Sequence, residues 1–249
     1  MMTTPSRVAV FGLVFALYGC KGSDSSPTSP SPLPTTTTAA AASGRALRFL
    51  FVHHSVGEGF LFDGGMWEML EGRGLEVHDR TYGDGWVGEN TDPEHFPITF
   101  AEHYQDMMTW ELPTGERYDI VAFKSCFPAS NICSEATLNE YRNYYNTIRN
   151  VIRQHPDVMF VPYATPPLVP NETEPHCAAR AREFANWLTG AYDDEPNIAA
   201  YNLFDVLAGE DNCLRGRYQS DPWDSHPNSQ ANRTVAEHFT QWLSSQGWF

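Results

Sequence analysis

Basic residues are scarce in this chain of 249 residues. It has 16 Lys and Arg against 31 Asp and Glu, which gives a formal net charge of −15 at pH 7. Arg7, Lys21 and Asp24 precede residue 45, so the remainder of the chain keeps 16 − 2 = 14 basic and 31 − 1 = 30 acidic residues, a net charge of −16. Such an acidic surface repels phosphate backbones. The composition therefore excludes nucleic acid as an expected partner.

Long apolar runs are also lacking. The apolar stretch 8–18 is too short to cross a bilayer as a helix, but with Arg7 before it the stretch is typical of a signal peptide. It ends in Leu17-Tyr18-Gly19-Cys20, which resembles a bacterial lipobox. The resemblance implies that residues 1–19 form a lipoprotein signal peptide and that Cys20 is lipidated. An ordinary secretory signal with an incidental cysteine is the alternative.

The segment after Cys20 cannot form a core. Residues 21–44 are almost entirely Ser, Thr, Pro, Ala, Gly and Lys, a composition typical of an extended tether. We therefore expect residues 20–44 to link a lipid anchor to a domain at 45–249. Lys21 follows the cysteine, and by resemblance to Gram-negative lipoproteins it disfavours retention in the inner membrane. The expected location is the bacterial cell envelope, at the outer membrane if the source is Gram-negative.

A Cys-x-x-Cys pair, the usual mark of a zinc or redox site, is absent. Four cysteines follow Cys20: Cys126, Cys133, Cys177 and Cys213. An even number in an exported chain indicates disulfides. Three pairings are possible, and the expected one joins Cys126 to Cys133 and Cys177 to Cys213.

Strand-like and helix-like segments alternate along residues 45–249. The short apolar runs predict strands at Leu47–Val52, Leu75–Arg80, Asp119–Lys124, Val158–Tyr163 and Ile198–Leu203. Helical spacing of apolar residues predicts helices at Phe60–Glu71, Phe100–Trp110, Ser134–His155, Cys177–Ala191 and Ser229–Gln246. This order is typical of a single α/β domain, a three-layer α/β/α sandwich around a parallel sheet of about five strands.

A serine and a histidine fall at the same edge of this sheet. Ser55 follows the first strand, and an expected Pro-rich loop at 221–228, with His226, follows the fifth. Ligands of such sheets bind beyond the carboxyl ends of the strands. A serine becomes a nucleophile when an imidazole accepts its proton and a carboxylate orients that imidazole. We therefore expect Ser55 as nucleophile, His226 as base and Asp224 as the orienting acid, with Asp221 as second choice.

These features resemble the SGNH (GDSL-type) hydrolases. In that family a serine follows the first strand, and an Asp/His motif precedes the last helix. Ser55 matches the nucleophile, and His226-Pro227-Asn228 matches the usual ending of the motif. The chain departs from the family in having His53-His54 before the serine, in lacking Gly-x-Asn-Asp after the third strand, and in having Trp223 where the family's acid usually lies.

The resemblance also implies an oxyanion hole, which holds the negative oxygen of the reacting ester. A glycine and an asparagine supply it in the family, together with the N–H of the nucleophile. Here Gly85 is the first candidate and Gly88 the second; Asn131 is the first candidate for the amide and Ser125 the second. The implied activity is that of a serine esterase, and the implied substrate is an O-acylated carbohydrate.

Two alternatives remain open. His53 and His54 could form a metal site with His226 and the two aspartates, although we expect no metal and no cofactor. A catalytically inactive, glycan-binding lipoprotein on the same fold is the alternative to an esterase.

Three aromatic residues near the site could stack on a sugar ring or belong to the core: Trp86, Phe127 and Trp223. The sequence does not indicate the oligomeric state.

Overall fold

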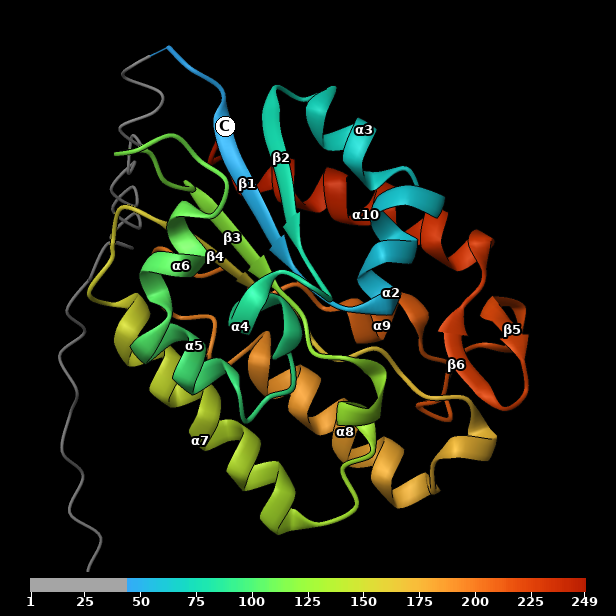
Figure 1. Ribbon diagram of the computed structural model, residues 1–249. Coiled ribbons are helices and arrows are strands. Elements are labelled where there is room, and N and C mark those ends of the chain that lie inside the picture. Colours follow the sequence, from blue (N-terminus) through green and yellow to red (C-terminus); the bar gives the residue numbers. More distant parts are fainter. Residues whose placement is uncertain (1–43) are drawn as a thin grey trace, which may run out of the picture. The chain divides into compact units, whose positions relative to one another are not determined.

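The computed structural model describes residues 44–249, and its centre is a sheet of four parallel strands (Figure 1). The strand order is β2-β1-β3-β4, with β1 at Leu47–Val52, β2 at Leu75–Arg80, β3 at Ile120–Phe123 and β4 at Met159–Pro162. Phe49 of β1 is in register with Val77 and Ile120. All six residues of β1 are buried, as expected of a central strand covered on both faces.

The predicted fifth strand is only partly present. Residues 198–203 run parallel to β4 but form isolated bridges, Phe160 with Ile198 and Tyr163 with Tyr201. Helix α9 (Leu203–Leu207) begins at the end of this segment, where the Asn202 side chain accepts a hydrogen bond from the Asp205 N–H at 3.1 Å. The helix cap thus ends the extended backbone, and the sheet has four continuous strands.

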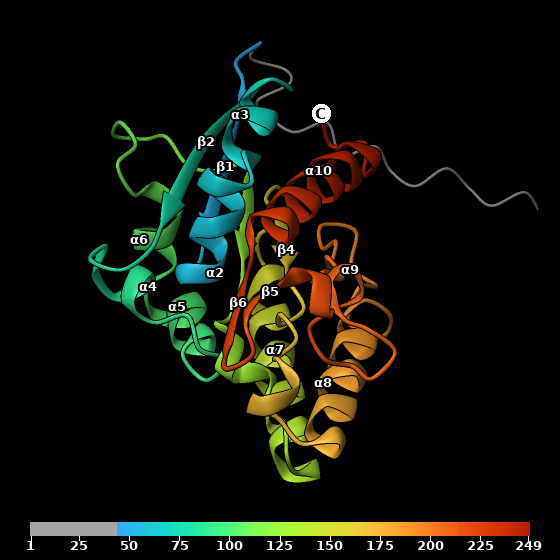
Figure 2. The same cartoon turned by 90° about the vertical axis from the view of Figure 1, so that its right-hand side faces the viewer.

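Helices cover both faces of the sheet, which gives the predicted three layers (Figures 1 and 2). One face packs against α2 (Ser55–Glu58), the π-helical turn η1 (Gly59–Asp63), α3 (Met66–Glu71) and α10 (Ser229–Ser245). The other packs against α4 (Gly85–Glu89), α5 (Phe96–Glu102), α6 (Tyr104–Thr109), α7 (Glu135–Ile152) and α8 (Pro175–Leu188). Short 3₁₀ turns lie in the connections, namely η2 (Phe127–Ser130), η3 (Pro170–Glu172) and η4 (Gly216–Tyr218).

Two predicted helices are interrupted. The segment 60–71 divides into η1 and α3 at Gly64, where a Cβ atom would lie 2.5 Å from the backbone oxygen of Asn232. Glycine therefore lets η1 approach α10 closely. The segment 100–110 divides at His103, whose backbone leaves the helical region between α5 and α6. The last helix is present, and the Asn228 side chain caps it by accepting the Ala231 N–H at 3.0 Å.

The Asp/His segment is a hairpin and not the predicted loop. Strands β5 (Gln219–Asp221) and β6 (Asp224–Pro227) pair antiparallel, and β6 contacts α2. Figure 2 shows this hairpin beside α2 and below the start of α10. The pairing matters for function because it fixes the direction in which alternate side chains of β6 point.

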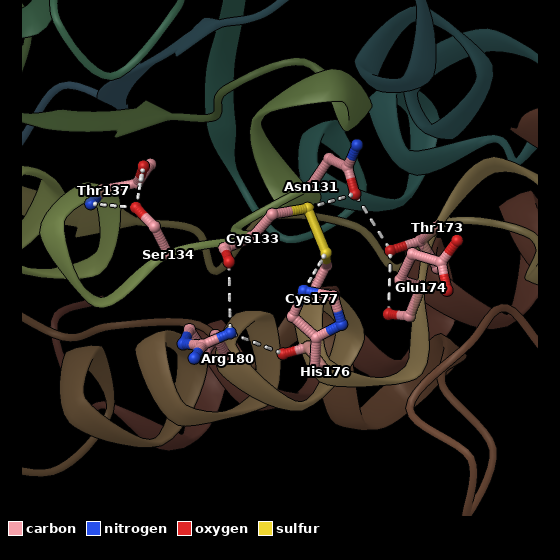
Figure 3. The surroundings of a disulfide bond; sticks show 9 residues. All are labelled: Asn131, Cys133, Ser134, Thr137, Thr173, Glu174, His176, Cys177 and Arg180. Carbon is pink, nitrogen blue, oxygen red and sulfur yellow. Dashed lines mark hydrogen bonds between the residues drawn. A yellow bond between two sulfur atoms is a disulfide. The ribbon is translucent and has the colours of Figure 1, made fainter.

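The disulfide pairing predicted from the sequence is wrong. Cys133 bonds Cys177, which joins the segment before α7 to the first turn of α8 (Figure 3). Cys126 and Cys213 carry free thiols. The bonded cysteines are 44 residues apart in the sequence and meet because α7 and α8 pack side by side.

The predicted signal peptide, the lipidation of Cys20 and nearly all of the predicted tether lie outside the described residues. Within residues 44–249, no helix combines the length and the apolar character needed to cross a membrane.

Candidate active site

Ser55 lies where the first strand turns into a helix. β1 ends at Val52, the backbone of His54 is extended, and α2 begins at Ser55. The Gly57 N–H donates to the His54 oxygen at 2.7 Å, which closes this turn. The hydroxyl of Ser55 is thereby presented at the carboxyl edge of the sheet, the edge at which α/β proteins bind their ligands.

Ser55, His226 and Asp224 form one continuous chain of contacts. The Oγ atom of Ser55 lies 2.9 Å from Nε2 of His226, and Nδ1 of His226 lies 2.5 Å from Oδ1 of Asp224. The backbone N–H of His226 also donates to Oδ1 of Asp224 at 2.9 Å. With Nδ1–H donated to the carboxylate, Nε2 is left free to accept the proton of the Ser55 hydroxyl.

The charge of Asp224 suits this role. The backbone N–H of His226 is the main cause that lowers the pKa of Asp224 below its ordinary value; the imidazole adds to the shift, and partial burial opposes it. Asp224 is therefore an acceptor-only carboxylate near neutral pH. Asp221, the second choice, accepts the Trp223 N–H at 2.8 Å in the turn of the hairpin instead.

The two histidines before Ser55 have separate partners. His53 is fully buried, and its Nε2 lies 3.2 Å from Oδ2 of Asp79. Nε2–H of His54 donates to the Gly88 oxygen at 2.6 Å. Among residues 44–249, the groups of ligating side chains close enough to share one ion include neither histidine. The structure thus gives the alternative metal site no support.

Two residues that no sequence motif indicated, Cys126 and Tyr82, lie beside Ser55. The Sγ atom of Cys126 is 3.9 Å from Oγ of Ser55. The phenol of Tyr82 lies close to both residues, and its ring stacks on His54 with centroids 3.8 Å apart. Burial raises the pKa of Tyr82, so its hydroxyl remains a proton donor at neutral pH.

The sequence positions of Tyr82 and Cys126 could have indicated that they belong to the site. Tyr82 lies two residues beyond β2, and Cys126 lies three residues beyond β3. Positions just beyond a strand of a parallel sheet face the site whatever residue occupies them. Neither residue is a glycine or an asparagine, the residue types that the family resemblance implies for the oxyanion hole.

The predicted oxyanion residues have other surroundings. Oδ1 of Asn131 accepts from the Thr173 hydroxyl at 3.0 Å, next to the disulfide (Figure 3). Gly85 is the first residue of α4, close to the guanidinium of Arg80. Ser125 is fully buried, and the Gly88 oxygen accepts from His54. Asn131, Gly85, Ser125 and Gly88 do not line the cavity at Ser55 described next.

An open cavity of about 350 Å³ lies beside the Ser55–His226 pair. Its other lining residues come from α2, η1, β6 and α10: Val56, Glu58, Gly59, Phe62, Asp63, Pro227 and Asn232. The volume is in the range of small-molecule sites. The ring of Phe127 makes an edge contact with the imidazole of His226, with the ring centroids 4.9 Å apart. A small ester could thus reach both the hydroxyl and the imidazole.

Comparison with known proteins finds similarity in fold. No family model and no curated protein matches the sequence. A solved protein of the G-D-S-L lipolytic family from Desulfitobacterium hafniense superposes with a TM-score of 0.51 at 13% identity, over 78% of this chain and 98% of that one. A protein assigned as an acylhydrolase from Bacteroides fragilis gives a TM-score of 0.50 at 13% identity, over 80% and 86%.

The chain shares the fold of the solved G-D-S-L lipolytic protein, a three-layer α/β/α sandwich. The predicted α/β/α architecture and the predicted likeness to this family are confirmed at the level of the fold. The two solved proteins are only 13% identical to this chain, so the chemistry must be argued from Ser55, His226 and Asp224 themselves.

Proposed function

We propose that this SGNH-fold protein is a serine esterase. The observation that carries the proposal is the contact chain from the Ser55 hydroxyl through His226 to the Asp224 carboxylate, with distances of 2.9 and 2.5 Å. Such an arrangement converts a weakly acidic hydroxyl into a nucleophile. The fold and the cavity at Ser55 support the same conclusion.

The reaction has two halves. Oγ of Ser55 attacks the ester carbonyl while Nε2 of His226 takes the hydroxyl proton. The imidazolium then gives that proton to the departing alcohol, which leaves an acyl group on Ser55. A water molecule, deprotonated by His226, releases the acid and restores the hydroxyl. Asp224 keeps the imidazole oriented and stabilises its positive charge in both halves.

The negative oxygen of the intermediate needs hydrogen-bond donors. The backbone N–H of Ser55 is the first candidate, and Gly85 and Asn131 stay predictions for the others. Tyr82 is an additional candidate because its neutral phenol lies beside the nucleophile. Removing one such donor from an esterase raises the barrier by about 3–4 kcal/mol.

We propose an O-acylated carbohydrate as the substrate. Exposed aromatic side chains lie on the elements around Ser55: Phe62 on η1, Tyr82 after β2 and Trp223 in the hairpin turn. Such rings can pack against the apolar face of a sugar. We also propose a lipid anchor at Cys20 and a place in the bacterial envelope. Both rest on the sequence of the first 44 residues.

The experiment is hydrolysis of p-nitrophenyl acetate by the purified protein, Ser55→Ala, His226→Ala and the matched control His103→Ala. We expect activity that both site variants reduce to background and that the control retains, with circular dichroism showing that all fold. Equal background rates in all four proteins would contradict the esterase and favour a glycan-binding protein, which direct binding to immobilised glycans would then test.

A further inference from the structure

The cavity beside Ser55 has an acidic wall. Glu58, from α2, and Asp63, from η1, both line it, and its lining residues include no lysine or arginine. Its only other titratable side chain is that of His226. A group bound here therefore meets two carboxylates and one imidazole. Such a wall attracts cations and hydrogen-bond donors and repels anions.

Asp63 is held in place from α10. Nδ2 of Asn232 donates to Oδ2 of Asp63 at 2.8 Å, and Asn232 is only 6% exposed. Gly59 permits this contact, because a Cβ atom there would lie 2.8 Å from the same Nδ2. Hydrogen bonds from Asn232 and Ser229 lower the pKa of Asp63, so the carboxylate is charged and keeps unused lone pairs.

The remaining wall is apolar. Phe62 is 56% exposed at the cavity, and its ring stacks on that of Trp67 with centroids 5.8 Å apart and planes 20° apart. Trp67 thus fixes one face of Phe62 and leaves the phenylalanine partly open to solvent. A flat ring that offers an apolar face to Phe62 and hydroxyl groups to the carboxylates would satisfy both walls.

The position of the cavity shows which part of an ester it can hold. His226 gives its proton to the departing alcohol, so the alcohol lies on the imidazole side of Ser55. Both Ser55 and His226 line the cavity. The alcohol part of the substrate is therefore the part that meets Glu58 and Asp63.

We propose that this cavity is the binding site for the alcohol part of the ester, and that its two carboxylates select a hydroxyl-bearing ring that is neutral or positively charged over one that carries a carboxylate. This inference rests on the proposed esterase function. It adds a binding site and a rule of charge selection that the triad alone does not provide.

The test compares three acetate esters acetylated at the same ring hydroxyl: those of methyl glucoside, methyl glucuronide and methyl glucosaminide with a free amine. We expect kcat/KM to be highest for the amine, intermediate for the neutral sugar and lowest for the uronate. At low ionic strength, each of the two carboxylates should change kcat/KM by about fivefold between one ester of the series and the next. Added salt should compress the series because it screens exposed charges.

The variants are Glu58→Gln, Asp63→Asn and the double exchange, with Glu71→Gln as a matched control on the exposed side of α3. We expect the single exchanges to reduce the amine-to-uronate ratio of kcat/KM, the double exchange to remove it, and Glu71→Gln to leave it as in the wild type.

The outcomes separate the two proposals. If the wild-type protein hydrolyses the esters without regard to charge, or if the ratio survives the double exchange, the acidic binding site is wrong and the esterase stands. If the wild-type protein hydrolyses neither these esters nor p-nitrophenyl acetate, the esterase itself is wrong. The dissociation constants of the three unacetylated sugars test the same order of charge preference without turnover.

Discussion

Asp224 lies two positions before His226 and contacts its imidazole because both residues belong to one strand, β6. Alternate residues of a strand point to the same side, so positions i and i+2 are neighbours. Ser225, between them, points the other way: it is fully buried, and its hydroxyl accepts the Val169 N–H at 2.9 Å and donates to Glu172. The usual family spacing of three positions is therefore not needed here.

This relationship predicts that Asp224→Asn lowers kcat by on the order of 10³- to 10⁴-fold. A neutral amide can donate to Nδ1 and so stabilise the wrong imidazole tautomer, and it does not stabilise the imidazolium. Rates with p-nitrophenyl acetate measure the effect. The matched control is Asp221→Asn, which changes a carboxylate in the same hairpin that contacts Trp223 instead. A larger loss in the Asp221 variant would contradict the assignment.

The free thiol next to the nucleophile leads to a second prediction. Burial would raise the pKa of Cys126, but hydrogen bonding with His54 and the charge of Lys124 outweigh it, so the pKa lies below its ordinary value. Iodoacetamide should therefore alkylate Cys126 faster than Cys213, which is buried and whose pKa burial raises. Because Sγ lies 3.9 Å from Oγ of Ser55, the adduct should block hydrolysis.

Mass spectrometry of partly labelled protein gives the order of alkylation, and the esterase rate gives its effect. The Cys126→Ala variant is the control: its rate should be the same before and after treatment. Loss of activity in that variant, or loss that follows labelling of Cys213, would show that Cys126 is not the residue responsible.

The sequence predicted those parts of the molecule that depend on local pattern. Strands β1 and β2 lie at the predicted residues, and the last helix begins at the predicted Ser229. Ser55 and His226 could be paired from 171 positions apart, because the carboxyl ends of parallel strands share one edge.

What the sequence could not show depends on contacts between distant segments. The choice between Asp224 and Asp221 depends on the β5–β6 hairpin. The prolines at 222 and 227 are not typical of strands, so the sequence does not indicate this hairpin. The Cys133–Cys177 bond depends on how α7 and α8 meet. The closeness of Cys126 to Ser55 depends on the path of the chain beyond β3, for which the sequence carried no familiar motif.

The disulfide leads to a third prediction. Joining residues 44 positions apart restricts the unfolded chain, and a loop of that length corresponds to about 4 kcal/mol in the chain-entropy description. The double variant Cys133→Ser, Cys177→Ser should lose unfolding free energy of that order in urea titrations. Reduction of the wild-type protein should give the same loss. Cys213→Ser, which removes a free thiol, serves as the control for exchange of a cysteine. An unchanged midpoint in the double variant would contradict the bond.

Lys124 gives the last prediction. Its side chain is fully buried and donates to the Ser125 oxygen at 2.9 Å, and burial lowers its pKa to about 8. In the unfolded chain the amine keeps its ordinary value of 10.5. Below about pH 8 both states carry the proton, and the buried charge destabilises the fold by about 3 kcal/mol. Between pH 8 and 10.5 the amine of Lys124 has lost its proton in the folded state and kept it in the unfolded state. The titration of Lys124 therefore makes the unfolding free energy of the wild type rise with pH.

A Lys124→Met variant lacks this titration. The difference in unfolding free energy between the variant and the wild type should therefore shift by about 3 kcal/mol in favour of the wild type from neutral pH to pH 10.5. Urea titrations at several pH values measure that difference. They are made in a Cys126→Ala background, because the charge of Lys124 also shifts the pKa of Cys126, whereas titrating groups that do not interact with Lys124 cancel in the difference. Lys124→Gln should show the same shift, since it too lacks the amine. A difference that stays constant with pH would mean that Lys124 keeps an ordinary pKa and is more hydrated than its full burial indicates.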